Sequence, residues 1–251
     1  MDMHLKKKTT LVTGGARGLG RAICLALAEE GANVAINYLR TDARELARRI
    51  EGDYGVKAVA VQGDLSKAED VRRVFDEAEA AVGALDILVN NAGTWPTAYV
   101  KDMTDEEWQS ALGVNLTGPF LTCREAVRRW IAAGRAGRII NITSQAAHHG
   151  ATSGHAHYAA AKAALGNFTN SLAREVAAHH IHVNAVAPGF MDTDMVGHAI
   201  RKDIQRYLDR IPLRRMADPA EIANAVVFLA SDRASYMTGA TLDVTGGMLM
   251  R

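Results

Sequence analysis

Two kinds of apolar pattern alternate along the 251-residue chain. Short runs rich in β-branched residues, without regular polar interruptions, are typical of strands buried on both faces. In the longer segments between them, apolar residues recur every three or four positions, which predicts amphipathic helices. The predicted strands are residues 8–13, 33–38, 56–61, 85–90, 138–143, 181–187 and 241–244. The predicted helices are residues 19–30, 42–51, 68–81, 104–133, 158–178 and 219–229.

Local signals mark several helix ends. Gly31 is placed to end the first helix in a left-handed conformation. Asp42 is a candidate N-cap, Thr104 with Glu107 three residues later makes a capping box, and Pro219 occupies a favoured first-turn position. Repeated alternation of strand and helix predicts an α/β fold, a doubly wound parallel sheet of about seven strands with helices on both faces. We expect one domain over residues 1–251, with irregular residues 189–212 as a substrate lid.

Composition and charge exclude several classes of protein. Hydrophobic residues make up 48% and charged residues 23%, which does not fit a disordered chain. The net charge of +1 shows no basic excess, so we expect no nucleic-acid partner. Only two cysteines occur, Cys24 and Cys123, too few for a disulfide framework. We find neither a signal peptide nor an apolar run of about 18 residues, and we expect a cytoplasmic protein without membrane contact.

A glycine-rich loop joins the first predicted strand to the first predicted helix. Its sequence, residues 13–20, is Thr-Gly-Gly-Ala-Arg-Gly-Leu-Gly. Glycines let the backbone approach a diphosphate, and the helix N-terminus that follows offers N–H groups. The spacing differs from GxGxxG, and no Lys-Ser/Thr pair follows as in a P-loop. The loop predicts a dinucleotide site at Gly14, Arg17, Gly18, Leu19 and Gly20.

The end of the second predicted strand bears on which dinucleotide binds. An NAD site usually has an acid here for the ribose 2′-hydroxyl, but this chain has Asn37 and no acid before Asp42. Arg40 lies beside it, and Arg17 lies in the glycine loop. Two guanidinium groups favour a 2′-phosphate and hence NADP(H). The alternative is that both arginines are solvated surface residues.

Polar residues gather where several predicted strands end. Tyr158 and Lys162 are four residues apart, on one helix face, and a neighbouring ammonium is expected to lower the pKa of a phenol. Ser144 follows the predicted strand 138–143, and residues 90–93, Asn-Asn-Ala-Gly, end another strand. Carboxyl ends of parallel strands share one edge of the sheet, where ligands bind.

With the glycine loop, these residues resemble the short-chain dehydrogenase/reductase family along nearly the whole chain. Residues 90–93 match its NNAG motif, and residues 184–189 match the segment beside the nicotinamide. Within the family, residues 188–195 and 239–248 are most similar to bacterial 3-oxoacyl-[acyl-carrier-protein] reductases. The resemblance implies a Rossmann-type fold and NADP(H) as the cofactor. It also implies reduction of a ketone, in this subgroup a 3-oxoacyl thioester, to a secondary alcohol.

The resemblance also assigns roles to single residues. Tyr158 is implied as general acid, Lys162 as its neighbour that also binds the ribose, Ser144 as the group that holds the substrate oxygen, and Asn115 as the anchor of a water. Asp64 would accept from the adenine amine. The implied cofactor-binding residues are Gly14, Arg17, Gly18, Leu19, Gly20, Arg40, Asp64, Leu65, Asn91, Gly93, Tyr158, Lys162, Pro188, Gly189 and Thr193.

The loop between Ser144 and Tyr158 departs from the subgroup. It is about one residue longer and contains His148, His149, His155 and His157. A metal site is one interpretation, but no carboxylate accompanies the histidines and the family's chemistry uses no metal. Pocket lining or solvent exposure is the interpretation that we favour, with no metal predicted.

Three alternatives for function stay open at this stage. The first is an NADP(H)-dependent reductase of a 3-oxoacyl thioester, carried by acyl carrier protein or coenzyme A. The second is a dehydrogenase of a sugar, small alcohol or pathway-specific ketone. The third is a non-catalytic nucleotide-binding relative, which the intact Ser144, Tyr158 and Lys162 argue against.

The resemblance implies a homotetramer and, for the first alternative, a basic docking patch beside the pocket. We expect Thr117, Leu121, Phe168 and Leu172 in the subunit contacts, together with residues 238–251. The two docking arginines of the subgroup correspond to Arg135 and to His179. A histidine carries less positive charge than an arginine at neutral pH, so docking on an acidic carrier would be weakened.

Overall fold

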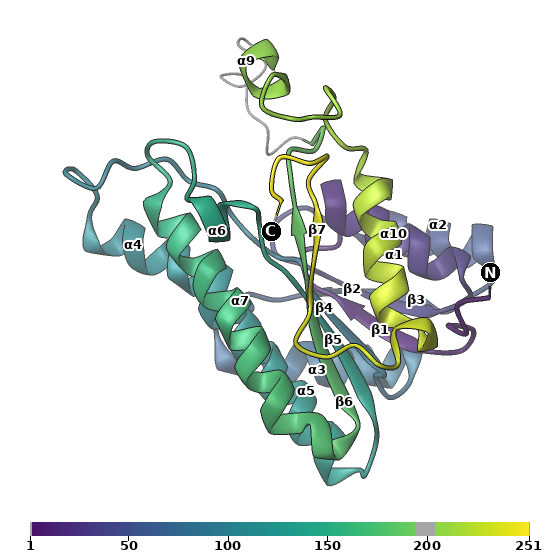
Figure 1. Ribbon diagram of the computed structural model, residues 1–251. Coiled ribbons are helices and arrows are strands. Elements are labelled where there is room, and N and C mark those ends of the chain that lie inside the picture. Colours follow the sequence, from purple (N-terminus) through teal and green to yellow (C-terminus); the bar gives the residue numbers. More distant parts are fainter. Residues whose placement is uncertain (1, 194–203, 251) are drawn as a thin grey trace.

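A seven-stranded parallel sheet forms the centre of the computed structural model, which describes residues 2–193 and 204–250 (Figure 1). The strand order is β3-β2-β1-β4-β5-β6-β7, and every neighbouring pair is parallel. The chain therefore reverses its winding direction between β1 and β4, where open α/β sheets bind ligands. The strands are β1 (Thr9–Val12), β2 (Asn33–Tyr38), β3 (Ala58–Gln62), β4 (Ile87–Asn90), β5 (Gly137–Ile142), β6 (Ile181–Pro188) and β7 (Thr241–Val244).

Helices cover both faces of the sheet and create two cores. Helices α1, α2 and α10 lie on one face, and α3, α5 and α7 lie on the other (Figure 1). Successive strand residues point to opposite cores, as Leu11 and Val12 do, which is why both must be apolar. The α-helices are α1 (Gly18–Glu29), α2 (Arg44–Tyr54), α3 (Ala68–Val82), α4 (Asp105–Leu112), α5 (Gly118–Ala132), α6 (Ala146–His149), α7 (Ala156–Val176), α9 (Ile204–Leu208) and α10 (Pro219–Ala230). The predicted α/β fold class is confirmed.

Most of the predicted helix ends are confirmed. Gly31 follows α1 with φ of +82°, and Thr104 forms the expected capping box with Glu107. Asp218 forms a second capping box at the start of α10, directly before Pro219. The prediction for Asp42 is wrong by one residue, because Ala43 is the N-cap of α2 and Asp42 instead accepts a hydrogen bond from the Arg44 amide at 2.9 Å.

The predicted helix 104–133 is interrupted. A π-helical turn, Gly113–Thr117, separates α4 from α5. In such a turn the backbone hydrogen bonds join residues five apart instead of four. Turns of this kind are frequent at functional sites. Here it carries Asn115, whose side chain is fully buried.

The predicted lid, residues 189–212, is described only in part. Residues 194–203 of the predicted lid lie outside the described residues. On the described part, Phe190 meets Tyr207 of α9 edge to face, with ring centroids 5.1 Å apart. Nothing in the structure tests whether residues 189–212 move, so the lid stays a prediction. In the described part of the chain, no helix combines the length and the apolar character that crossing a membrane requires.

Candidate active site

A cleft of about 660 Å³ opens along the carboxyl ends of the strands. Ligand sites typically have this size and lie at this edge of an α/β sheet. It is lined by every predicted cofactor-binding residue, from Gly14 in the first loop to Thr193, and by Ser144. Asn115 is the one predicted site residue that does not line it.

The glycine loop has the geometry that a dinucleotide requires. Gly14 and Gly18 have φ of +61° and +52°, which favours glycine. A Cβ on Gly20 would lie 2.3 Å from the Gly14 carbonyl oxygen and 2.6 Å from Asn91 Nδ2, so no larger residue fits. Asn91 Nδ2 donates to the carbonyls of Thr13 and Gly14, at 2.9 and 3.1 Å. Asn91 therefore shapes the loop as well as lining the cleft.

The N-terminus of α1 faces this cleft without an acidic neighbour. Arg17 precedes the helix in an extended conformation, and its side chain does not cap the helix. The first turn contains no Asp or Glu. An anion such as a diphosphate fits the N–H groups and positive dipole end at this position.

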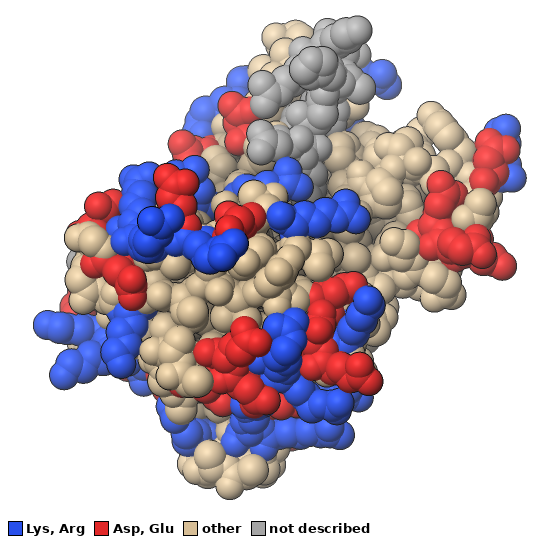
Figure 2. Space-filling model, turned by 180° about the vertical axis from the view of Figure 1, so that it is seen from behind, with Lys and Arg blue, Asp and Glu red and all other residues tan. Residues whose placement is uncertain are grey.

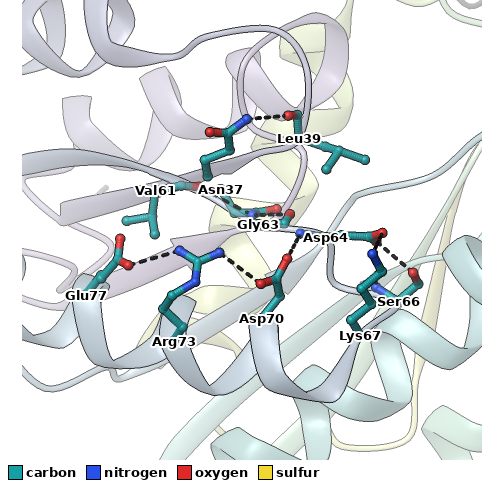
Figure 3. Close-up of polar contacts among 11 residues, drawn as sticks. Asn37, Leu39, Val61, Gly63, Asp64, Ser66, Lys67, Asp70, Arg73 and Glu77 are labelled. Atoms are coloured by element: carbon teal, nitrogen blue, oxygen red, sulfur yellow. Dashed lines mark hydrogen bonds and ion pairs between the residues drawn. The ribbon is translucent and has the colours of Figure 1, made fainter.

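Asp64 lines the cleft, and Figure 3 shows its polar contacts. One of its carboxylate oxygens accepts from the Ser66 hydroxyl at 2.7 Å, and its amide donates to Asp70 at 2.7 Å. Arg73 in turn bonds Asp70 at 3.0 Å, and together these contacts hold the pKa of Asp70 below its usual value. Oδ1 of Asp64 is engaged by Ser66, and Oδ2 lies 3.8 Å from Lys67 Nζ, so the adenine contact of Asp64 stays a prediction.

Asn37, in β2, lines the cleft, and its side chain is held by hydrogen bonds to two neighbouring loops. Its side chain is 2% exposed and its amide nitrogen donates to Gly63 of the β3 end at 3.1 Å (Figure 3). Its amide oxygen accepts from the Gly14 amide at 3.3 Å. The residue therefore braces the glycine loop against the sheet as well as lining the cleft.

Arg40, two residues beyond β2, is exposed and lines the cleft. Its guanidinium group makes no ion pair with any residue within 2–193 or 204–250. The nearby Arg44 differs, since it pairs with Asp42 at 2.6 Å. Among the described residues, the Arg40 guanidinium is therefore a cation of the cleft that is not engaged in an ion pair.

Ser144 and Tyr158 also line the cleft. Ser144 follows β5 and its hydroxyl accepts from the Ala146 amide at 3.1 Å. Burial raises the pKa of Tyr158, and a hydrogen bond with Ser144 opposes that rise. The expected net lowering of the Tyr158 pKa beside Lys162 is not found, because desolvation of the phenolate is the larger effect.

Lys162 is one turn further along α7 and is 3% exposed. Its Nζ donates to the Ile142 carbonyl at 2.8 Å and lies 5.9 Å from the centre of the Tyr158 ring. Burial lowers the pKa of Lys162 to about 8. Lys162 thus titrates close to the working range of an enzyme.

Asn115 is buried next to the site without lining the cleft. Its side-chain nitrogen donates to the carbonyls of Thr94 and Ala111, both at 3.0 Å, and its oxygen accepts from the Thr94 amide at 3.2 Å. Both amide hydrogens are thus used within the protein. The side chain braces the loop after residues 90–93, and its role as the anchor of a water stays a prediction.

Pro188, Gly189 and Thr193 lie at the predicted nicotinamide end. A Cβ on Gly189 would lie 2.8 Å from Thr245 Cα, which requires glycine for this close approach. The Pro188 carbonyl accepts from the Gln145 amide at 3.1 Å, so this segment is tied to the loop that carries Ser144. Thr193 reaches back to the glycine loop at Gly18.

The four histidines of the loop occupy different environments. His148 and His149 are on α6 and exposed, and His155 and His157 are buried. Across the residues that are described, no three His, Cys, Asp or Glu side chains gather as metal ligands would. His149 lines the cleft, as the pocket-lining interpretation expects.

Sequence analysis missed Trp95 as a lining residue of the cleft. Its indole stacks on His155, with ring centroids 4.2 Å apart and planes at 21°. Periodicity gives no signal for such a contact, because the two residues are 60 positions apart. The sequence indicates a place near the site only through the short distance of Trp95 from Gly93 and of His155 from Tyr158 along the chain.

Arg135 and His179 do not lie beside the cleft of their own chain. Arg135 precedes β5 and pairs with Asp86 at 2.9 Å, and His179 precedes β6, so both are at the amino ends of the strands. The 21 residues of α7 separate His179 from the region of Tyr158 by about 30 Å. A docking patch beside the pocket of one chain is therefore wrong.

Comparison with known proteins agrees with this geometry. A family model described as enoyl-(acyl carrier protein) reductase matches residues 14–249. The crystal structure of a short-chain type dehydrogenase/reductase from Mycobacterium marinum is 34% identical, with a TM-score of 0.93, and covers 100% of this chain and 98% of its own. The chain belongs to the short-chain dehydrogenase/reductase family. It is therefore an oxidoreductase, and the family implies a nicotinamide cofactor.

Two relatives show which short-chain dehydrogenase/reductases this chain is similar to along its whole length. A 3-oxoacyl-[acyl-carrier-protein] reductase of Aquifex aeolicus (strain VF5) is 43% identical over 249 residues, which is 99% of this chain and 100% of the relative. A protein of the same name from Staphylococcus epidermidis is 42% identical over 246 residues, or 97% and 99%. The chain is thus similar to 3-oxoacyl-[acyl-carrier-protein] reductases over their full length.

Proposed function

We propose that this protein is a cytoplasmic NADPH-dependent reductase that converts a 3-oxoacyl thioester to the 3-hydroxyacyl thioester. The observation that carries the proposal is one cleft lined both by the glycine loop and by Ser144, Tyr158 and Lys162. The names of the full-length relatives support the substrate class. Arg40, without an ion pair among the described residues, supports the choice of NADPH.

The residues of the cleft fit the cofactor. Gly14, Gly18 and Gly20 let backbone approach a diphosphate at the start of α1. Asp64 would hold the adenine and Arg40 the 2′-phosphate. When bound, NADPH supplies a hydride to the carbonyl carbon.

Tyr158 supplies the proton. The raised pKa of Tyr158 keeps the phenol protonated at neutral pH, the form that a general acid requires. As negative charge develops on the substrate oxygen, the Tyr158 hydroxyl donates its proton to it and the Ser144 hydroxyl donates a hydrogen bond. The resulting phenolate is stabilised by the Lys162 ammonium, whose charge has little screening because the group is buried.

Assembly is the second part of the proposal. The 3-oxoacyl reductase resemblance implies a homotetramer, and exposed Phe120 on α5 meets Phe168 on α7 edge to face at 6.1 Å. Leu121 and Leu172 belong to the core instead of this face, so only Thr117 and Phe168 of the four predicted contacts are open to a partner. In such an assembly Arg135 and His179 of one chain would have to serve the cleft of another.

A panel of ketones tests the proposal. NADPH oxidation is followed with acyl-carrier thioesters, coenzyme A thioesters, diketones and sugars, each with and without added salt. The proposal expects the highest kcat/KM with a 3-oxoacyl thioester. If a sugar or a simple alcohol in the reverse direction gives the highest kcat/KM, the thioester assignment is wrong. If acyl-carrier and coenzyme A thioesters respond identically to salt and to His179→Arg, docking through His179 is wrong.

A further inference from the structure

Trp95 lies on a loop that begins beside the catalytic groups but has no part in the mechanism above. Two residues earlier, a Cβ on Gly93 would lie 3.6 Å from Lys162 Nζ and 3.0 Å from Asn115 Oδ1. Thr94 is bonded to Asn115 through both its amide and its carbonyl. The backbone that presents Trp95 to the cleft is therefore fixed relative to Lys162.

His155 fixes the indole from its other side. It precedes α7, three residues before Tyr158, and is 7% exposed. Its Nδ1 lies 2.8 Å from the Pro96 carbonyl oxygen. Because a carbonyl oxygen only accepts, Nδ1 carries the proton and donates. The imidazole is thus held in one orientation, stacked on Trp95 at 4.2 Å.

The two loops are joined beyond this stack. The Ala98 amide donates to the Gly154 carbonyl at 2.8 Å. A Cβ on Gly154, which has φ of +84°, would lie 2.9 Å from Thr97 Cγ2, so the backbones approach closely there. Residues 94–98 and 154–155 therefore form one latch, and within it the stack on His155 holds the indole of Trp95.

The wall of the cleft that Trp95 lines contains apolar residues beside polar ones such as Gln145, His149 and Thr152. The apolar residues include Ala146, Ala151, Phe190, Met191 and Met248. A rigid indole in such a wall favours a flat apolar group, which gains aromatic contact without losing rotamer freedom. A flexible alkyl chain loses that freedom when it is ordered against the same wall.

We propose that Trp95 determines substrate specificity, with His155 as its positioning residue, and that the pair selects 3-oxo substrates whose oxo carbon carries a flat aromatic ring. This inference rests on the proposed carbonyl reduction and narrows its substrate class. A 3-oxoacyl group that ends in an aromatic ring places that ring next to the carbonyl that Tyr158 and Ser144 bind. A linear 3-oxoacyl chain offers only flexible methylenes at this position.

Two esters with the same reacting group test this. NADPH-dependent reduction of ethyl benzoylacetate is compared with that of ethyl 3-oxohexanoate. We expect the wild type to show at least a tenfold higher kcat/KM for the aryl ester. Trp95→Leu, which keeps an apolar side chain but removes the flat ring, should abolish most of this preference through a higher KM for the aryl ester, and Trp95→Phe should keep it.

The positioning role of His155 is tested by the preference for the aryl ester over the alkyl ester, which a general loss of stability would not change. His155→Ala should lower the aryl preference at nearly constant kcat for the alkyl ester, and His155→Phe, which keeps the stack, should restore it. Trp108→Ala on α4 is the matched control and should leave the ratio unchanged. A wild-type ratio near one, or equal losses for both esters in Trp95→Leu, would overturn the proposal.

Failure of the proposed function is separable from failure of this inference. If the wild type reduces neither ester with NADPH, the proposed carbonyl reduction is wrong. Calorimetric binding of ethyl benzoylacetate to the wild type and to Trp95→Leu then decides the second question. Weaker binding by at least tenfold in Trp95→Leu supports the specificity assignment, and equal binding refutes it.

Discussion

Arg40→Ala tests how the cleft distinguishes NADPH from NADH. Arg40 is exposed, lines the cleft and makes no ion pair with a described residue, so removing it breaks no contact of the folded protein. A charge-assisted bond to a phosphate contributes roughly 1.5–3 kcal/mol, and solvent screening reduces this to about 1–2 kcal/mol here. We therefore expect the KM for NADPH to rise about 5- to 30-fold, while the KM for NADH stays within about twofold.

The assay is initial-rate kinetics with both cofactors at fixed ketone concentration, at low and at moderate salt. Arg44→Ala is the matched control, because Arg44 is already paired with Asp42 and should leave both KM values unchanged. Asn37→Asp is a second arm. It places a carboxylate beside the Gly63 carbonyl and should impair both cofactors rather than favour NADH. Equal efficiency of the wild type with NADH and NADPH, or equal KM increases in Arg40→Ala, would refute the reasoning.

Three further predictions concern pH, stability and assembly. Because burial lowers the pKa of Lys162 to about 8, its ammonium loses a proton as pH rises through that value. The kcat for ketone reduction should therefore fall above about pH 8, and a kcat that stays constant up to pH 9.5 would contradict this. His157 is fully buried, and neither of its ring nitrogens has a hydrogen-bond partner among the residues that the structure describes. His157→Leu should therefore raise the free energy of unfolding by about 1–2 kcal/mol in urea denaturation, with exposed His149→Leu as the control; no gain would mean that the ring has a partner. Light scattering at micromolar concentration should give about four times the chain mass of 27.0 kDa, and a monomer mass would refute the tetramer.

The buried parallel sheet was largely predictable from the sequence, for a physical reason. A strand with helices on both faces must be apolar on both sides, so its residues form a continuous run. Residues 241–244 match β7, and the ends of β2 and β6 differ from prediction by at most one residue. Capping at Thr104 and Pro219 was equally local and was confirmed.

Features that depend on distant contacts were not predictable. The π-turn at Asn115 is stabilised by Thr94, 21 positions away, and the Trp95–His155 stack joins two loops. The orientation of Asn37 depends on the Gly63 carbonyl of another strand end. Nothing in the periodicity of one segment encodes these partners.

Basic and acidic side chains are intermingled on the face that Figure 2 shows, as the net charge of +1 leads one to expect. Arg129 illustrates this, because it bonds Asp76, Glu79 and Glu125 at 2.7–2.8 Å and so joins α3 to α5. Its charge is satisfied within the protein. Cations that matter for ligand binding must instead be sought along the cleft, where sequence reasoning placed Arg17 and Arg40.

Turnover of the Tyr158→Phe variant tests the central claim most directly. Phenylalanine keeps the ring of Tyr158 and removes only the hydroxyl that donates the proton. Ketone reduction should fall by about 10²–10⁴-fold, while titration of NADPH fluorescence gives an unchanged dissociation constant. Retained turnover in a variant that still binds NADPH would remove Tyr158 from the chemistry and contradict the account.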